Sequence, residues 1–413
     1  MPSYLPRLVE PVIDELAAEL SALMIVGPRA IGKTTTFSRR AATIIELNVE
    51  AQAAAFKADP DAALRGLEEP VLLDEWQAVP GVLGAVARSV NADPRPGRFL
   101  VTGSALPGKE EGPWPGTGRL QRVQMLPMTI AEQRNIQLRP FLERVLAGVL
   151  ATPAEQLDIR DYVTLALSGG FPRPALQLSS VRARTSWFDS YLYDLFHHDA
   201  EQIEPTRTRP RGADSLRDYF EAYALNSAGV CPHKTIYDAA QIRRETGEAY
   251  DAILGRLYVV EEVPGWMTNR LSRLTEMPKR YVIDPALLAY LLRVDVAGVM
   301  RDGDLLGRVI DTFVAAQLRP ELAVSDQQPR LYHLRTQGGR QEVDLLIEFG
   351  GDRVLGIEVK AAAAVGREEA KHLLWLRERL GDRFLAGVVV HSGPTVFEID
   401  DRIVAAPIST LWS

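Results

Sequence analysis

The strongest constraint on the fold of this 413-residue chain is an eight-residue stretch near its N-terminus, Gly27-Pro28-Arg29-Ala30-Ile31-Gly32-Lys33-Thr34. It follows the apolar run 22–26 directly and fits the pattern G-x-x-x-x-G-K-T, in which a strand ends in a glycine-rich loop and a helix begins. Such a loop surrounds phosphate groups with backbone N–H groups, and Lys33 can reach the β and γ phosphates. The Thr34 hydroxyl can hold Mg²⁺ at the N-terminus of the helix. The pattern predicts that these residues, together with Thr35, bind ATP or GTP.

Composition bounds the class of protein without identifying it. A chain of this length with 46% hydrophobic residues is expected to form two or three globular domains. The net charge of −7 gives no overall attraction for nucleic acid or an anionic membrane, so any such contact requires a local patch. The single cysteine, Cys231, excludes an intrachain disulfide, and neither a signal peptide nor a membrane-spanning run is indicated. We therefore expect a cytoplasmic protein without a membrane partner.

The hydrophobic pattern changes along the chain and predicts an α/β protein of three domains, at residues 1–130, 131–295 and 296–413. The first domain alternates strand-like runs with helix-length segments, which is typical of a doubly wound parallel sheet. The second domain is mostly helical, and the third begins with a helix followed by strands, a helix and further strands. The five runs read as strands in the first domain are 22–26, 43–49, 70–74, 98–102 and 119–125.

A second nucleotide-binding feature lies about 40 residues after Lys33, where an apolar strand ends in Asp74-Glu75. A parallel sheet brings the carboxyl ends of its strands to one edge, so both acids are expected beside the phosphate loop. Asp74 would contact Mg²⁺ through water, and Glu75 would polarise the attacking water. Thr102 ends another strand with a hydroxyl that can sense the γ phosphate, although a plain strand exit explains Thr102 equally well.

Stretches spread over nearly the whole chain resemble prokaryotic AAA-type ATPases known only as ATP-binding proteins, whose C-terminal half is a domain of unknown function. The stretches are YLPRLVEP (4–11), GPRAIGKTTT (27–36), LLDEWQ (72–77), PGRFLVTGS (96–104), PGTGR (115–119), SGGFPRPAL (168–176), WFDSYLYDLFHHD (187–199), YVIDPALLAYLL (281–292), EVDLLIE (342–348) and GIEVKA (356–361). The resemblance implies a P-loop sheet of AAA type that uses ATP and Mg²⁺.

The same resemblance suggests roles for two further residues. Arg119 is a candidate arginine finger that acts on the nucleotide in cis or from a neighbouring subunit of a homo-oligomer. A surface arginine at the start of a strand is the alternative. Pro172 is a candidate contact for the adenine, with a plain structural turn as the alternative.

Residues 234–263 follow the order of a winged helix, two helices and a strand, with a turn predicted at Gly247. The second helix carries Glu248 and Asp251 and a single cation, so its charge would repel a phosphate backbone. A structural or lid role is therefore favoured over DNA reading. The three arginines of 206–211 are a better candidate for phosphate contact, against the alternative of a solvated loop.

A second candidate site lies in the third domain, where strand-like runs at 342–348 and 353–360 form a predicted hairpin. If the hairpin is centred on the middle of its Gly-Gly-Asp loop, Asp344 lies opposite Glu358. Two carboxylates about 5 Å apart would repel unless a cation lay between them. Lys360 points to the same face as Glu358 because side chains alternate along a strand. A glycine bulge would shift this register by one residue.

An aspartate followed by E-x-K on the next strand is the pattern of the PD-(D/E)xK nuclease-like fold, which this domain resembles. In active members the acids hold Mg²⁺ or Mn²⁺, and the lysine helps to activate or orient water for phosphodiester cleavage. The resemblance implies Asp344 and Glu358 as metal ligands and catalytic residues, together with Lys360. An earlier helix offers Asp311 as a further ligand, although relatives more often carry glutamate there. A partly buried ion pair is the structural alternative for Glu358 and Lys360.

The sequence leaves two functions of different classes open. In the first, ATP binding and hydrolysis control a Mg²⁺- or Mn²⁺-dependent nuclease that cuts DNA or RNA. In the second, the chain is an ATP-driven switch that binds a nucleic acid or protein partner through the nuclease-like domain without cutting it. A purely protein-remodelling ATPase is a weaker third interpretation.

Overall fold

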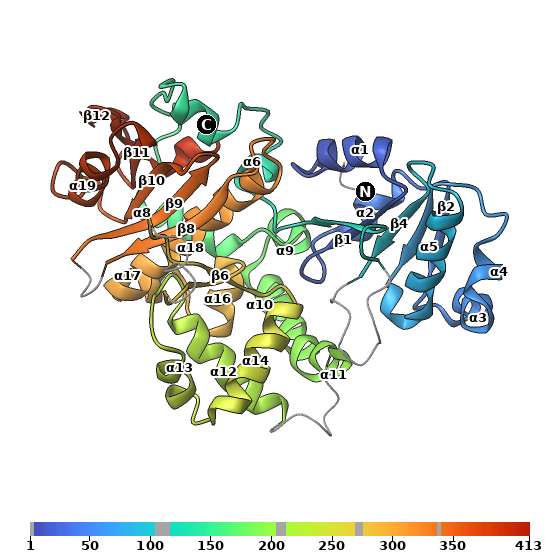
Figure 1. The fold of residues 1–413 in the computed structure, drawn as a ribbon. Coiled ribbons are helices and arrows are strands. Elements are labelled where there is room, and N and C mark those ends of the chain that lie inside the picture. Colours follow the sequence, from blue (N-terminus) through green and yellow to red (C-terminus); the bar gives the residue numbers. More distant parts are fainter. Residues whose placement is uncertain (1–3, 104–115, 204–211, 269–275, 337–339) are drawn as a thin grey trace.

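The computed structural model describes residues 4–103, 116–203, 212–268, 276–336 and 340–413. The chain forms a parallel sheet with helices, then a group of helices, then a mixed sheet, and Figure 1 shows the two sheets at opposite ends of the molecule. The predicted α/β class is confirmed. The arginines of 206–211 lie outside the described residues. None of the helices in the described ranges combines the length and apolarity that a membrane span requires.

All five strands predicted for the N-terminal part are present, and they lie parallel in the order β2-β3-β4-β1-β5. The strands are β1 (Ala22–Val26), β2 (Thr43–Glu46), β3 (Val71–Asp74), β4 (Phe99–Thr102) and β5 (Gln121–Gln124). The helices of this part are α1 (Glu10–Glu19), α2 (Lys33–Ser38), α3 (Glu50–Ala58), α4 (Pro60–Leu64) and α5 (Gly81–Ala92). Strands β2 and β5 are each three residues shorter than predicted.

Strand β1 is buried on both faces, as a central strand between two layers of helices must be. Its alternate residues enter two separate cores, because successive side chains of a strand point to opposite faces. Leu23 and Ile25 belong to one core, and Ala22, Met24 and Val26 belong to the other. This double burial explains the continuous apolar run that precedes the glycine-rich loop.

The part that follows the first sheet is mainly helical. Its elements are α6 (Ile130–Gln133), α7 (Phe141–Leu146), α8 (Ile159–Ser168), α9 (Pro172–Leu176), α10 (Val181–Asp194), a π-helical turn (Leu195–Asp199), α11 (Ala200–Ile203), α12 (Ala213–Leu225), α13 (His233–Ala239), α14 (Arg244–Arg256), β6 (Val260–Val263), β7 (Lys279–Val282), α16 (Pro285–Leu291) and α17 (Val296–Arg301). The turn before α9 joins this part to the first sheet, because Met128 N donates to the Gly170 carbonyl at 2.7 Å. Gly170 N in turn donates to Asp284 Oδ2 at 2.7 Å, and Asp284 caps α16.

The order predicted for residues 234–263 is present as α13, α14 and β6, and β6 pairs antiparallel with β7. The predicted turn at Gly247 is wrong, because Gly247 lies inside α14. A Cβ atom at this position would lie 2.2 Å from the Tyr237 ring, so the glycine permits α13 and α14 to pack closely. The Asp251 carboxylate accepts hydrogen bonds from the hydroxyl groups of Tyr219 and Tyr237. Helix α14 therefore turns this acid toward the neighbouring helices.

The C-terminal part is a six-stranded mixed sheet in the order β12-β13-β11-β10-β9-β8. Its elements are α18 (Gly303–Ala323), β8 (Arg330–Arg335), β9 (Glu342–Phe349), β10 (Arg353–Lys360), α19 (Lys371–Leu380), β11 (Phe384–His391), β12 (Phe397–Asp400) and β13 (Ile403–Pro407). Strands β9 and β10 form the predicted hairpin, in which Ile357 pairs with Leu345. This register is centred on Gly351, as predicted, and the paired residues end one position before the expected Asp344–Glu358 pair.

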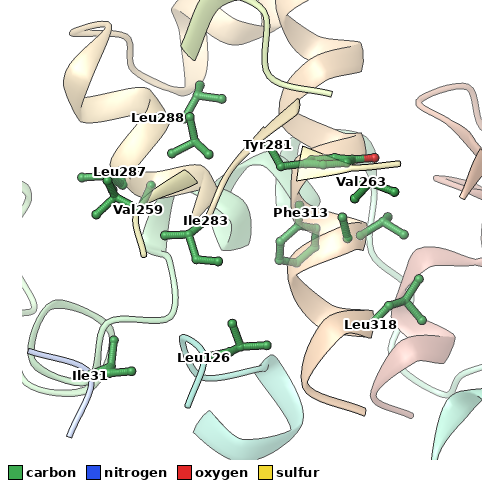
Figure 2. Packing of buried hydrophobic residues seen from close by; sticks show 14 of the residues in the cluster. Ile31, Leu126, Val259, Val263, Tyr281, Ile283, Leu287, Leu288, Phe313 and Leu318 are labelled. Atoms are coloured by element: carbon green, nitrogen blue, oxygen red, sulfur yellow. The ribbon is translucent and has the colours of Figure 1, made fainter. Parts of the chain in front are cut away.

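The largest hydrophobic core contains residues from all three parts of the chain. Figure 2 shows several of them, including Ile31 of the glycine-rich loop, Leu126 after β5, Ile283 before α16 and Phe313 of α18. The C-terminal Trp412 lies in the same core, with its ring edge-on to Tyr162 of α8. The three parts therefore share buried surface, although each predicted domain contains its own secondary structure.

Candidate functional site

The glycine-rich loop connects β1 to α2, and its own backbone holds Lys33. The Lys33 ammonium donates to the Gly27 carbonyl at 2.9 Å and to the Pro28 carbonyl at 2.7 Å. Gly27 has φ +147°, and a Cβ atom there would lie 2.2 Å from the Met125 carbonyl oxygen, so only glycine fits. Burial lowers the pKa of Lys33 to about 8, against the opposing attraction of Glu75 and Asp74. An anion placed beside Lys33 would compensate for this burial.

Three predicted residues meet at the carboxyl edge of the sheet, beside the loop. The Thr34 hydroxyl donates to Asp74 Oδ1 at 2.8 Å, and the Thr102 hydroxyl donates to the same oxygen. Asp74 and Thr102 are buried, and they end β3 and β4. Hydroxyl and carboxylate oxygens are the ligands that Mg²⁺ prefers, so Thr34 and Asp74 fit a magnesium ion. Thr35 lies on the exposed side of α2, next to this group.

Glu75 follows β3 immediately and has a left-handed backbone conformation, with φ +55°. Its carboxylate accepts a hydrogen bond from the Gln77 side chain, and its charge acts on buried Lys33. The acid is therefore held near the phosphate loop, within the electrostatic range of Lys33. This position suits the predicted role of Glu75 toward an attacking water.

Arg119 lies at the other edge of the sheet. It precedes β5, which runs parallel to β1 and pairs Gln121 with Leu23, whereas the phosphate loop follows the carboxyl end of β1. The guanidinium donates to Asn91 Oδ1 at 2.7 Å and to the Thr117 carbonyl at 3.1 Å. This position is away from the phosphate loop of the same chain, as expected for a surface arginine at the start of a strand, and action on the nucleotide of a neighbouring subunit stays a prediction.

Pro172 begins α9 and lies against the phosphate loop. A Cβ atom built on Gly32 would be 4.0 Å from Pro172 Cγ. The preceding Gly170 is bound to Met128 on one side and to Asp284 on the other. The loop therefore lies near the same turn that joins the first sheet to the helical part.

Two contacts of the phosphate loop were not predicted. Arg29 forms an ion pair with Asp199 of the π-helical turn, and buried Arg7 donates to the Ile31 carbonyl at 2.8 Å. Beside the first contact lies a cavity of about 540 Å³, lined in part by Arg29, Trp187 and Tyr191. Both contacts join segments far apart in sequence, so spacing alone gives no signal for them.

The C-terminal hairpin brings together the three predicted residues of the second site. The Lys360 ammonium donates to Glu358 Oε2 at 2.7 Å and lies 4.0 Å from Asp344 Oδ2. Asp344 Oδ2 also accepts from Val359 N at 2.9 Å. Burial raises the pKa of Glu358 well above its usual range, and the charge of Asp344 adds to this effect. The E-x-K pattern and the hairpin register were therefore sufficient to predict this convergence.

The sequence did not predict a second lysine in this cluster. Lys279 begins β7 and is buried, and its ammonium lies 2.6 Å from Asp311 Oδ2 and 3.2 Å from Asp344 Oδ1. Burial opposes the charge of Lys279, but the two aspartates raise its pKa well above the usual value, so the side chain is an ammonium. Lys279 and Tyr281 are two residues apart on β7, so their side chains lie on the same face of the strand. Apart from this, the local sequence does not indicate that Lys279 joins the cluster.

The predicted metal ligands Asp311, Asp344 and Glu358 do come together, with Lys279 between the two aspartates. Within the described ranges, no group of three or more histidine, cysteine, aspartate or glutamate side chains is arranged to hold a metal ion. The physical reason is that the ammonium groups of Lys279 and Lys360 already occupy the space between the carboxylates. The cluster in this arrangement does not fit Mg²⁺ or Mn²⁺.

The parallel sheet, the glycine-rich loop after β1 and the acids after β3 give the first part the fold of an AAA-type P-loop domain. Proteins with such domains bind and hydrolyse ATP. Residues 20–133 match the family described as AAA domain. Residues 159–297 and 306–411 match two families described as domains of unknown function, DUF8612 and DUF4143.

The chain is similar over most of its length to proteins without an assigned function. It is 27% identical over 401 residues to the uncharacterized protein Rv2008c of Mycobacterium tuberculosis and to Mb2031c of Mycobacterium bovis. Each alignment covers 93% of this chain and 79% of the relative. A structure of RuvB from Thermotoga maritima aligns with 65% of this chain and 91% of its own, at 13% identity and a TM-score of 0.26, which is too low to support an argument.

Proposed function

We propose that this chain is an ATP-hydrolysing switch, in which the nucleotide state of the first domain is passed to the helical and C-terminal parts. The observation that carries it is the convergence of Lys33, Thr34, Asp74 and Thr102 at one edge of the parallel sheet. A nucleoside triphosphate requires this set of donors and oxygens.

The residues of the loop divide the chemistry among them. Lys33 releases its contacts with the loop carbonyls and binds the β and γ phosphates of ATP, aided by the backbone of residues 27–32. Glu75 polarises the attacking water, and Thr102 contacts the γ phosphate. Magnesium bound by Thr34 and Asp74 would neutralise charge that develops on the phosphates. An Arg119 from a second copy of the chain would complete the site in a homo-oligomer.

Two contacts provide routes by which the nucleotide acts on the rest of the molecule. Pro172 lies against the loop and is two residues from Gly170, which binds the cap of α16 through Asp284. Arg29 is paired with Asp199, so a bound phosphate competes with this carboxylate for the guanidinium. Release of Asp199 would free the π-helical turn that joins α10 to α11.

The C-terminal domain is proposed to bind a partner, either a nucleic acid or a protein, without cutting it. This choice follows from the acids of the domain, which are paired with Lys279 and Lys360. A second candidate function is Mg²⁺- or Mn²⁺-dependent cleavage of DNA or RNA. It is favoured by one observation, the convergence of Asp344, Glu358 and Lys360, which matches the nuclease-like pattern.

One experiment distinguishes these two functions. Wild type and Lys360→Ala are incubated with ATP and either Mg²⁺ or Mn²⁺, together with single-stranded DNA, duplex DNA or RNA, and phosphate release and polymer length are followed together. We expect phosphate release with intact polymers for both proteins. Cleavage by wild type that Lys360→Ala abolishes would establish the nuclease instead. An absence of phosphate release, with no affinity for ATP, would contradict the assignment of the first domain.

A further inference from the structure

The two aspartates of the C-terminal cluster are fully engaged by groups of the protein. Asp311 Oδ1 accepts from the Tyr281 hydroxyl at 2.8 Å, and Asp311 Oδ2 accepts from Lys279. Asp344 Oδ1 accepts from Lys279, and Asp344 Oδ2 accepts from Val359 N. Each of the four oxygens therefore has a donor. A divalent ion requires about six oxygen ligands and would have to displace several of these donors.

The cation that satisfies this site comes from a different part of the chain. Lys279 is on β7, which pairs with β6 next to the helical part, whereas Asp311 is on α18 and Asp344 is on β9. The Lys279 side chain is 2% exposed, so water does not replace its contacts. Its ammonium also donates to the Asp344 backbone carbonyl at 3.2 Å. The ammonium has three N–H donors and all three are used.

We propose that the Lys279 ammonium takes the place of a divalent metal ion between Asp311 and Asp344, so that this acidic cluster is complete without such an ion. The cluster then serves to fasten β7 to the C-terminal sheet, and the domain binds its partner independently of Mg²⁺ or Mn²⁺. The partner binding rests on the proposed function, whereas the fastening by Lys279 is tested without nucleotide, because the cluster contains no residue of the first domain.

The role of Lys279 is tested by binding of Mn²⁺ to the nucleotide-free full-length protein, measured from the spin-resonance signal of free Mn²⁺. Wild type is expected to bind no more Mn²⁺ than Asp344→Asn. Lys279→Met removes the ammonium and keeps most of the apolar stem, but its side chain is one atom shorter and vacates the position of Nζ. It is expected to gain one site that binds Mn²⁺ at least about tenfold more tightly than wild type does. The double variant Lys279→Met/Asp344→Asn should lose that site.

Lys360→Met is the matched control, because it removes the other lysine of the cluster and leaves Lys279 in place. It is expected to gain no Mn²⁺ site. A wild-type site that Asp344→Asn removes would overturn the proposal, and so would a folded Lys279→Met protein that binds no additional Mn²⁺.

Thermal unfolding gives a second readout in case Lys279→Met is poorly folded. In excess EDTA its melting temperature is expected to fall by more than about 5 °C, because buried Asp311 loses its counter-ion and partly buried Asp344 loses the nearer of its two. Added Mn²⁺ should recover most of this loss, while the melting temperature of wild type stays unchanged. A wild-type protein that Mn²⁺ stabilises through Asp344, or a variant that Mn²⁺ fails to stabilise, would contradict the role of Lys279.

Discussion

Replacement of Lys33 by alanine is expected to reduce ATP hydrolysis by about 10²–10³-fold. Lys33 is buried, and without nucleotide its ammonium donates only to carbonyl groups of the loop itself among the contacts described. When ATP binds, the ammonium moves from this unfavourable site to the phosphates, where it stabilises negative charge. The alanine variant lacks this positively charged donor. ATP affinity should fall as well, because the charge is lost in the ground state too. The measurement is phosphate release at saturating ATP, with ATP affinity determined separately.

The matched control is Lys57→Ala, which removes a lysine of the same domain from an exposed pair with Glu50. Its turnover should equal that of wild type, because exposed pairs contribute little. If Lys33→Ala retained more than a third of the wild-type rate, the phosphate loop could not be the hydrolytic site.

The pKa of Lys33 adds a pH dependence with a definite sign. Burial lowers this pKa to about 8, so the nucleotide-free side chain loses its proton as the pH rises through that value. The neutral amine attracts phosphate poorly. ATP affinity should therefore be constant below about pH 7 and fall above about pH 8, by at most about tenfold for each pH unit. An affinity that is flat up to pH 10 would contradict this assignment.

Replacement of Glu75 by glutamine is expected to separate binding from hydrolysis. The variant keeps the size of the side chain and a group that can contact Gln77, but it loses the carboxylate that polarises water. Turnover should fall by about 10²–10⁴-fold, the usual contribution of a general base, while ATP affinity changes by less than about threefold. The measurements are single-turnover hydrolysis and equilibrium binding of ATP.

Glu46 offers the control for Glu75. It ends β2, pairs in register with Asp74 and lies exposed at the same edge of the sheet. Glu46→Gln should hydrolyse ATP at the wild-type rate, because its carboxylate is not held beside Lys33. Equal losses of turnover in the two variants would mean that hydrolysis depends on the total negative charge at this edge of the sheet and not on Glu75 as a specific base.

The features that the sequence predicted well are local. The glycine-rich loop needs only one strand, one turn and one helix, and the register of the β9–β10 hairpin follows from the length of its loop. Asp74 and Thr102 could be placed because parallel strands end at a common edge. The strand runs were visible because burial on both faces requires continuous apolar residues.

The features that the sequence did not predict depend on long-range packing. Lys279 meets Asp344 across 65 residues, and Arg29 meets Asp199 across 170. No spacing in the sequence predicts either pair, because packing against the shared hydrophobic core determines where β7 and the π-helical turn lie. Gly247 was assigned to a turn because glycine usually interrupts helices, whereas the Tyr237 ring requires it inside α14.

The central claim, that the nucleotide state reaches the helical part, is tested most directly by hydrogen exchange of Glu75→Gln with and without ATP. We expect ATP to change the exchange of amides in the phosphate loop and also around Gly170 and in the π-helical turn at 195–199. The change around Gly170 follows from the position of Pro172 near the loop, and the change at 195–199 follows from the competition of phosphate with Asp199. Changes confined to residues 1–130 would contradict the switch and leave an ATPase uncoupled from the rest of the chain.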